Sequence, residues 1–180
     1  MFHQILVALD LEKTSQTVFR QAMEMAKAMN ARLMLLHVLN EDQGMPPLES
    51  MASVGYYPGS LSLEGAKQYQ QSWQRYIDQS LEQLRVCAQQ AEKAGVMVEF
   101  TQTTGRTGRM ICDQARNWNA DLIIVGRRGQ SALSELLLGS VSNYVTHHAS
   151  CAVMVVQSSK TSQDTAQVET NDQQAKALVS

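Results

Sequence analysis

The sequence has few cysteines and aromatic side chains and no long apolar run, and each shortage excludes a class of protein. The three cysteines, Cys87, Cys112 and Cys151, are odd in number and form no C-x-x-C pair. This favours reduced, structural thiols in a cytoplasmic protein over a disulfide scaffold. No apolar run approaches the roughly 20 residues that a membrane helix needs. The opening residues Met1-Phe2-His3-Gln4 lead into a strand pattern rather than a signal peptide.

Neither sign of charge is in large excess. The formal net charge is −2 and aromatic residues make up 6% of the chain, so we expect no nucleic-acid partner and no membrane surface. The 180 residues are 44% hydrophobic, which is typical of one globular domain with a core of its own.

The prolines are few and gathered in one place. Pro46, Pro47 and Pro58 all lie between residues 40 and 64, which predicts a long loop. Residues 158–180 are polar with few apolar groups and are predicted to be a disordered tail. We therefore expect one domain over residues 1–157, followed by a tail over residues 158–180.

Short apolar runs alternate with amphipathic stretches along this domain. The runs are unalternating, as in strands buried on both faces. Strands are predicted at residues 5–9, 33–38, 96–100, 122–125 and 152–156, with helices near 14–29, 65–94, 108–118 and 141–145. This order predicts an α/β fold with a doubly wound, five-stranded parallel sheet. If the strand order is 3-2-1-4-5, the ligand crevice lies between the first and fourth strands, where Asp10 and Gly126 end them.

The most informative segment follows the fourth strand. Gly126, Gly129 and Gly139-Ser140 are spaced G-x2-G-x9-G-S, and another apolar, helical stretch begins at Val141. A strand that ends in glycine lets backbone approach a ligand, and a helix start offers unpaired N–H groups to phosphate. The segment contains no lysine and matches neither the Walker A loop nor G-x-G-x-x-G.

Other residues give weaker indications. Arg127 and Arg128 lie beside this segment, where an arginine can bind phosphate oxygens or remain solvated. His37 is either structural or close to a ligand. The segment 104–108 is favoured as a helix entry only. No Ser-His-Asp, Cys-His or paired-carboxylate arrangement indicates a catalytic site, and His147 and His148 do not share a helix face for a metal.

The glycine spacing matches the ATP-binding signature of the universal stress protein family, which this chain resembles over residues 2–157. The run from Ile5 to Asp10 is similar to that family's first strand, and the runs at 36–38, 121–126 and 152–156 resemble later strands. The resemblance implies the strand order 3-2-1-4-5. One departure is Leu11-Glu12, where the family often has Gly-Ser after the aspartate.

The resemblance also implies a nucleotide site. Asp10 and Val38 flank the adenine and ribose, Gly126 and Gly129 let backbone approach the ribose and phosphates, and the helix start holds the phosphates. Arg128 lines the site, whereas Arg127 points away. The complete implied set is Ala8, Asp10, Val38, Val125, Gly126, Arg128, Gly129, Gly139, Ser140, Val141 and Ser142.

The implied ligand is ATP with Mg2+, and the implied assembly is a homodimer formed by antiparallel pairing of the last strands, Ala152 to Val156. Two alternatives stay open at this point. The same cradle can take AMP or a cyclic nucleotide, and some family members bind no nucleotide and act through protein contacts. Because Asp10 is the one carboxylate expected to reach the site, any ATP hydrolysis is expected to be slow.

Overall fold

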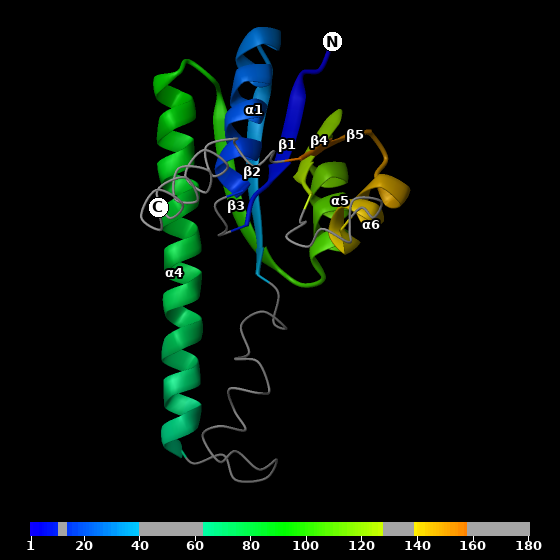
Figure 1. Ribbon diagram of the computed structural model, residues 1–180. Coiled ribbons are helices and arrows are strands. Elements are labelled where there is room, and N and C mark those ends of the chain that lie inside the picture. Colours follow the sequence, from blue (N-terminus) through cyan, green and yellow to red (C-terminus); the bar gives the residue numbers. More distant parts are fainter. Residues whose placement is uncertain (11–13, 40–62, 128–138, 158–180) are drawn as a thin grey trace, which may run out of the picture.

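The computed structural model describes residues 1–10, 14–39, 63–127 and 139–157, and strands and helices alternate along them (Figure 1). The elements are β1 (Gln4–Ala8), α1 (Thr14–Met29), β2 (Arg32–Leu39), α4 (Leu63–Lys93), β3 (Val98–Thr104), α5 (Thr107–Asn117), β4 (Leu122–Gly126), α6 (Ser140–His148) and β5 (Ala152–Val156). The predicted α/β class is confirmed.

The five strands form one parallel sheet in the order β3-β2-β1-β4-β5. Every pairing is parallel, with Ala8 of β1 lying between Leu36 of β2 and Val125 of β4. The chain order reverses between β1 and β4, which confirms the predicted switch point. In such sheets the crevice beyond the strand ends at this reversal is where ligands bind.

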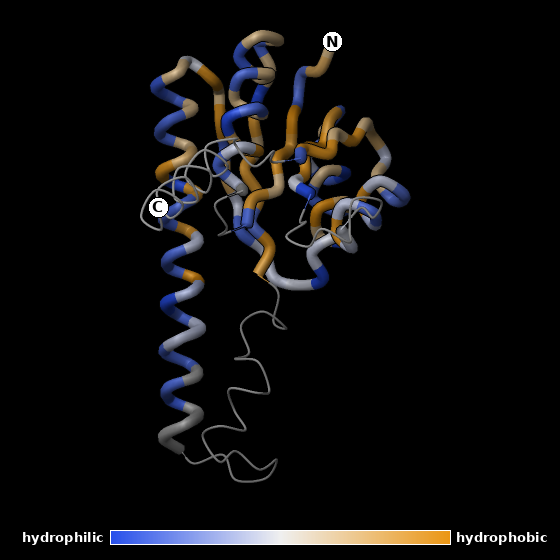
Figure 2. The backbone as a smooth tube through the Cα atoms, in the orientation of Figure 1, coloured by the Kyte–Doolittle hydropathy of each residue, from blue (hydrophilic) through white to orange (hydrophobic). Residues whose placement is uncertain are grey.

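Helices cover both faces of the sheet, and each face has its own apolar core. On one face Ile5 and Val7 of β1 pack with α1 and α4, and on the other Leu6 packs with α5 and α6. The division follows from the alternation of side chains along a strand. Figure 2 shows hydrophobic residues along the strands. The N-terminal half of α4, which projects beyond the sheet, is largely hydrophilic.

The third strand differs from its prediction at both ends. The predicted strand at residues 96–100 is β3 at Val98–Thr104. Val96 is buried in the turn that ends α4, where its N–H donates to Ala91 O at 3.0 Å and Gly95 has φ 83°. The polar residues up to Thr104 extend because β2 continues to Leu39 and pairs with them throughout.

In the part of the chain that the structure describes, no helix is long and apolar enough to cross a membrane. The loop predicted over residues 40–64 ends two residues earlier, because α4 begins at Leu63; residues 40–62 and the predicted tail at 158–180 lie outside the described residues. Both therefore stay predictions.

Candidate functional site

A cavity of about 220 Å3 lies at the switch point, beyond the ends of β1 and β4. It is several times the roughly 30 Å3 that one water molecule occupies, so it can receive an organic group. Its described lining is Ala8, Leu9, Asp10, Ser15, Val18, Leu36, His37, Val38, Thr107, Ile111, Val125, Gly126, Arg127, Gly139, Ser140, Val141 and Ser142.

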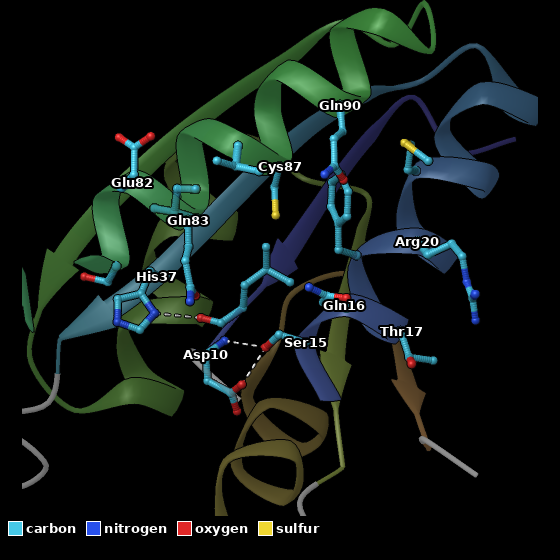
Figure 3. A pocket seen from close by; sticks show the side chains of 16 residues that line it. Asp10, Ser15, Gln16, Thr17, Arg20, His37, Glu82, Gln83, Cys87 and Gln90 are labelled. Atoms are coloured by element: carbon cyan, nitrogen blue, oxygen red, sulfur yellow. Dashed lines mark hydrogen bonds between the residues drawn. The ribbon is translucent and has the colours of Figure 1, made fainter. Parts of the chain in front are cut away.

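The end of β1 places a carboxylate on the cavity wall. The backbone N–H of Asp10 donates to Ser15 Oγ at 2.8 Å, and the Ser15 hydroxyl donates to Asp10 Oδ1 (Figure 3). Ser15 lies in the first turn of α1. The pair therefore fixes the carboxylate at the point where the chain passes from strand to helix.

The end of β2 offers backbone groups to the cavity. Leu9 N–H donates to Leu36 O at 2.9 Å, so the backbone groups of Leu36 point toward β1. In a parallel strand the groups two residues further along point the same way. The N–H and C=O of Val38 consequently point toward the position beyond the end of β1, where they can hydrogen-bond the edge of a ligand.

His37 lies between these two strand ends and is 3% exposed. Its Nδ1 is 2.8 Å from Leu9 O, which can only accept, so Nδ1 carries the proton. Nε2 then accepts from the Tyr76 hydroxyl of α4 at 3.4 Å. Burial lowers the pKa of His37 below 6.5, against smaller raising effects from the Leu9 hydrogen bond and the Asp10 charge. The imidazole is neutral at pH 7 and supports the Leu9–Asp10 backbone.

The end of β4 brings bare backbone close to the cavity. Gly126 pairs with Val156 of β5, and Arg127 N–H donates to Val156 O at 2.8 Å. A Cβ built on Gly126 would lie 3.0 Å from Val18 Cγ2 of α1. Glycine is needed here partly because α1 packs against this strand end.

The start of α6 supplies the groups that suit an anion. The N-cap residue Gly139 has no side-chain cap, and the earliest helical bond is from Asn143 N–H to Gly139 O at 2.8 Å. The Ser142 hydroxyl also donates to Gly139 O. No described residue caps the N–H groups of Ser140, Val141 and Ser142, and the helix dipole favours negative charge beside them.

The structure thus brings together most of the predicted site. Ala8, Asp10, Val38, Val125, Gly126, Gly139, Ser140, Val141 and Ser142 all line one cavity. Arg128 and Gly129 lie outside the described residues, so their roles stay predictions. Arg127 was predicted to point away; the residue belongs to the cavity lining, and its Nη1 donates to Gln157 Oε1 at 3.3 Å.

Sequence reasoning missed several lining residues. Thr107 lines the cavity, although its segment was favoured as a helix entry only. Ile111 lies one turn further along α5, where the helical spacing of Ile111 and Ala115 was the available signal. Ser15 lines the cavity and pairs with Asp10, and a serine at the start of a helix was the available signal.

A larger groove, of about 670 Å3, lies between α1 and α4 on the other face of the sheet. Figure 3 shows the lining of this groove, and Leu9, Asp10, Ser15 and His37 belong to the lining of the cavity as well. Its amide side chains, Gln16, Gln83 and Gln90, are exposed and lie on helix surfaces. The smaller cavity is the stronger site because helix start, strand ends and carboxylate converge there.

Among the described residues, no cluster of histidine, cysteine or carboxylate side chains could hold a metal ion by itself.

Fold and site together define a doubly wound α/β protein with a helix start facing the switch-point cavity. The universal stress protein family model matches residues 1–157. Universal stress protein Sll1388 of Synechocystis is 35% identical over 160 residues, which cover 87% of this chain and 98% of that protein. The chain belongs to the universal stress protein family.

Solved structures agree with this fold. A universal stress protein in complex with cAMP has a TM-score of 0.58 at 21% identity, covering 88% of this chain and 98% of that one. An Arabidopsis thaliana family protein with AMP bound has a TM-score of 0.57 at 20% identity, covering 88% and 93%. At these identities the likeness shows the fold.

Proposed function

We propose that this chain binds ATP in the switch-point cavity and acts in the stress response as a nucleotide-dependent homodimer. The observation that carries the proposal is the convergence of the α6 start, the Val38 backbone and the end of β4 on one cavity. A helix start suits phosphate, and the apolar residues near Val38 suit a flat base. The cAMP and AMP in the two solved relatives support a nucleotide ligand.

Asp10 is the one carboxylate in the described lining, and its Oδ1 already accepts from Ser15. Mg2+ is commonly held by one or two carboxylates together with substrate phosphates and water. The donor set therefore fits a metal that arrives with the triphosphate, with Asp10 as its protein partner. Phosphoryl transfer also needs a positioned base. Besides Asp10 the described lining offers His37, whose two ring nitrogens are engaged by Leu9 O and the Tyr76 hydroxyl, so we expect a binder with slow turnover at most.

The first test changes charge at the α6 start without filling the cavity. Ser140 is exposed at the first position of the helix. Ser140→Asp places a carboxylate where the dipole favours it, which stabilises the fold slightly but repels phosphate. We expect Mg-ATP affinity, measured by titration calorimetry, to fall more than tenfold while the melting temperature is maintained. Ser140→Asn is the neutral control.

Equal affinity in Ser140→Asp and Ser140→Asn would place the phosphates elsewhere. AMP and a cyclic nucleotide are tested in the same titration, because the cradle is compatible with either and the solved relatives hold them. Tighter binding of one of these would keep the site and replace the ligand. An absence of binding by all three would favour the non-nucleotide interaction protein.

The proposed dimer uses β5, which is the edge strand of the sheet. Val156 O accepts from Arg127 N–H, so the backbone groups of Val156 and Met154 point toward β4. Those of Val153 and Val155 point outward by alternation, available to a second copy. Val155→Pro removes an outward N–H that β4 does not use. Light scattering should show a dimer for the natural chain and a folded monomer for this variant, and a dimer in both would contradict β5 pairing.

A further inference from the structure

The two ends of the nucleotide cavity differ in chemistry. At the β4 side lie Gly126 and the α6 start, whose uncapped N–H groups and helix dipole favour negative charge. At the β2 side the lining side chains Leu36, Val38 and Ile111 are apolar and buried. The second end is therefore suited to a flat base rather than to phosphate.

One polar side chain interrupts this apolar end. Thr107 is the first residue of α5, and α5 follows β3, whose Thr103 pairs with Val38 of β2. The chain thus returns Thr107 to the β2 side of the cavity, one helical turn before Ile111. His37, the chain neighbour of Val38, also lines the cavity, but its two ring nitrogens are already hydrogen-bonded to Leu9 O and the Tyr76 hydroxyl.

The Thr107 hydroxyl is available to a ligand. Within the described part of the chain it makes no hydrogen bond, and the side chain is only partly buried. The hydroxyls of Ser15 and Ser142 are occupied by Asp10 and Gly139 O, and that of Ser140 lies at the α6 start, on the phosphate side of the cavity. A threonine hydroxyl both donates and accepts, so it can meet a ring nitrogen or an exocyclic amino group.

We propose that Thr107 hydrogen-bonds the nucleobase and thereby contributes to the selection of nucleotides over other phosphate compounds. This inference rests on the proposed nucleotide function. Val38 binds one edge of the base through its backbone, and Thr107 supplies a side-chain contact from the helix opposite. The apolar side chains of Leu36, Val38 and Ile111 offer no hydrogen bond, so the hydroxyl of Thr107 adds a contact that they cannot replace.

The test compares Thr107→Val, which is nearly isosteric, with Thr107→Ser, which keeps the hydroxyl. Thr17→Val is the matched control, because Thr17 lies on α1 and lines the groove on the other face. Calorimetry should show that Thr107→Val binds Mg-ATP about three- to tenfold more weakly, which corresponds to the loss of one net hydrogen bond. Thr107→Ser and Thr17→Val should stay within about twofold of the natural chain.

Adenosine and inorganic triphosphate, used as competitors against ATP, locate the contact. If Thr107 contacts the base, Thr107→Val lowers the affinity for adenosine by the same factor as the affinity for ATP and leaves the affinity for triphosphate unchanged. An unchanged ATP affinity overturns the inference, and so does a loss shared by triphosphate but not by adenosine. Failure of the natural chain to bind any nucleotide would instead overturn the proposed function, so the two failures are distinguishable.

Discussion

Asp10 and Ser15 hold each other by two hydrogen bonds that run in opposite directions. The Asp10 N–H donates to Ser15 Oγ, and the same hydroxyl donates back to the Asp10 carboxylate. The pair joins Asp10, which follows the end of β1, to Ser15 in the first turn of α1. Both residues line the cavity and also the groove between α1 and α4. One hydroxyl thus satisfies a backbone donor and orients the carboxylate.

Ser15→Ala removes both bonds and leaves a half-buried N–H without its partner. We expect the free energy of unfolding, measured in urea, to fall by about 1–2 kcal/mol, and Mg-ATP affinity to weaken as the carboxylate loses its orientation. Ser72→Ala is the control, since Ser72 donates to Gln68 O on the exposed surface of α4. Equal stability of the two variants would show that the pair contributes nothing.

Gly126→Ala tests the contact between the end of β4 and α1. Its Cβ would lie 3.0 Å from Val18 Cγ2, so we expect overpacking to cost about 1–3 kcal/mol in urea unfolding. Adding Val18→Ala makes room, and the double variant should be more stable than the sum of the two single losses predicts, by at least about 0.5 kcal/mol. Strict additivity would contradict the contact.

Gly108→Ala tests the packing of α5 on α6. A Cβ at Gly108 would lie 2.7 Å from Tyr144 Cδ1, closer than real contacts allow. Tyr144 is stacked on His148 with ring centroids 4.0 Å apart, so its ring cannot move without losing that stacking. We expect the free energy of unfolding to fall by about 1–3 kcal/mol, as measured by thermal unfolding. Adding Tyr144→Ala should restore part of this stability. An unchanged melting temperature in Gly108→Ala would contradict this packing.

His37 makes stability depend on pH. Because burial holds the pKa of folded His37 below 6.5, the unfolded chain binds more protons as the pH falls below 6.5. The stabilisation is therefore complete above pH 6.5 and is lost as the pH falls through the lowered pKa. We expect the free energy of unfolding, measured in urea, to fall less between about pH 7 and pH 5 for His37→Asn than for the natural chain. Equal losses of stability in the two proteins would show that His37 does not control this pH range.

The sequence was sufficient for features that depend on local chemistry. The apolar runs at 5–9 and 122–125 predicted buried strands, and Gly139-Ser140 predicted the start of α6, because burial and helix starts impose their own residue types. The strand order needed the resemblance to a family as well, since periodicity does not say which strands are neighbours. From that order, the meeting of Asp10 with Gly126 followed.

Features that depend on distant neighbours could not be predicted. β3 extends to Thr104 because β2 reaches Leu39, not because Thr101–Thr104 is apolar. Thr107 looked like an ordinary first helical residue, and only the pairing of β3 with β2 brings it to the cavity.

The extension of β2 past the end of β1 has an evolutionary consequence. At Val38 the hydrogen-bonding groups that face the cavity belong to the main chain, which every non-proline residue carries in the same form. Side-chain substitution can therefore change the shape of this wall but cannot delete its donor and acceptor. A site built in this way can persist while its sequence drifts, and it is lost only when the strand itself shortens or moves.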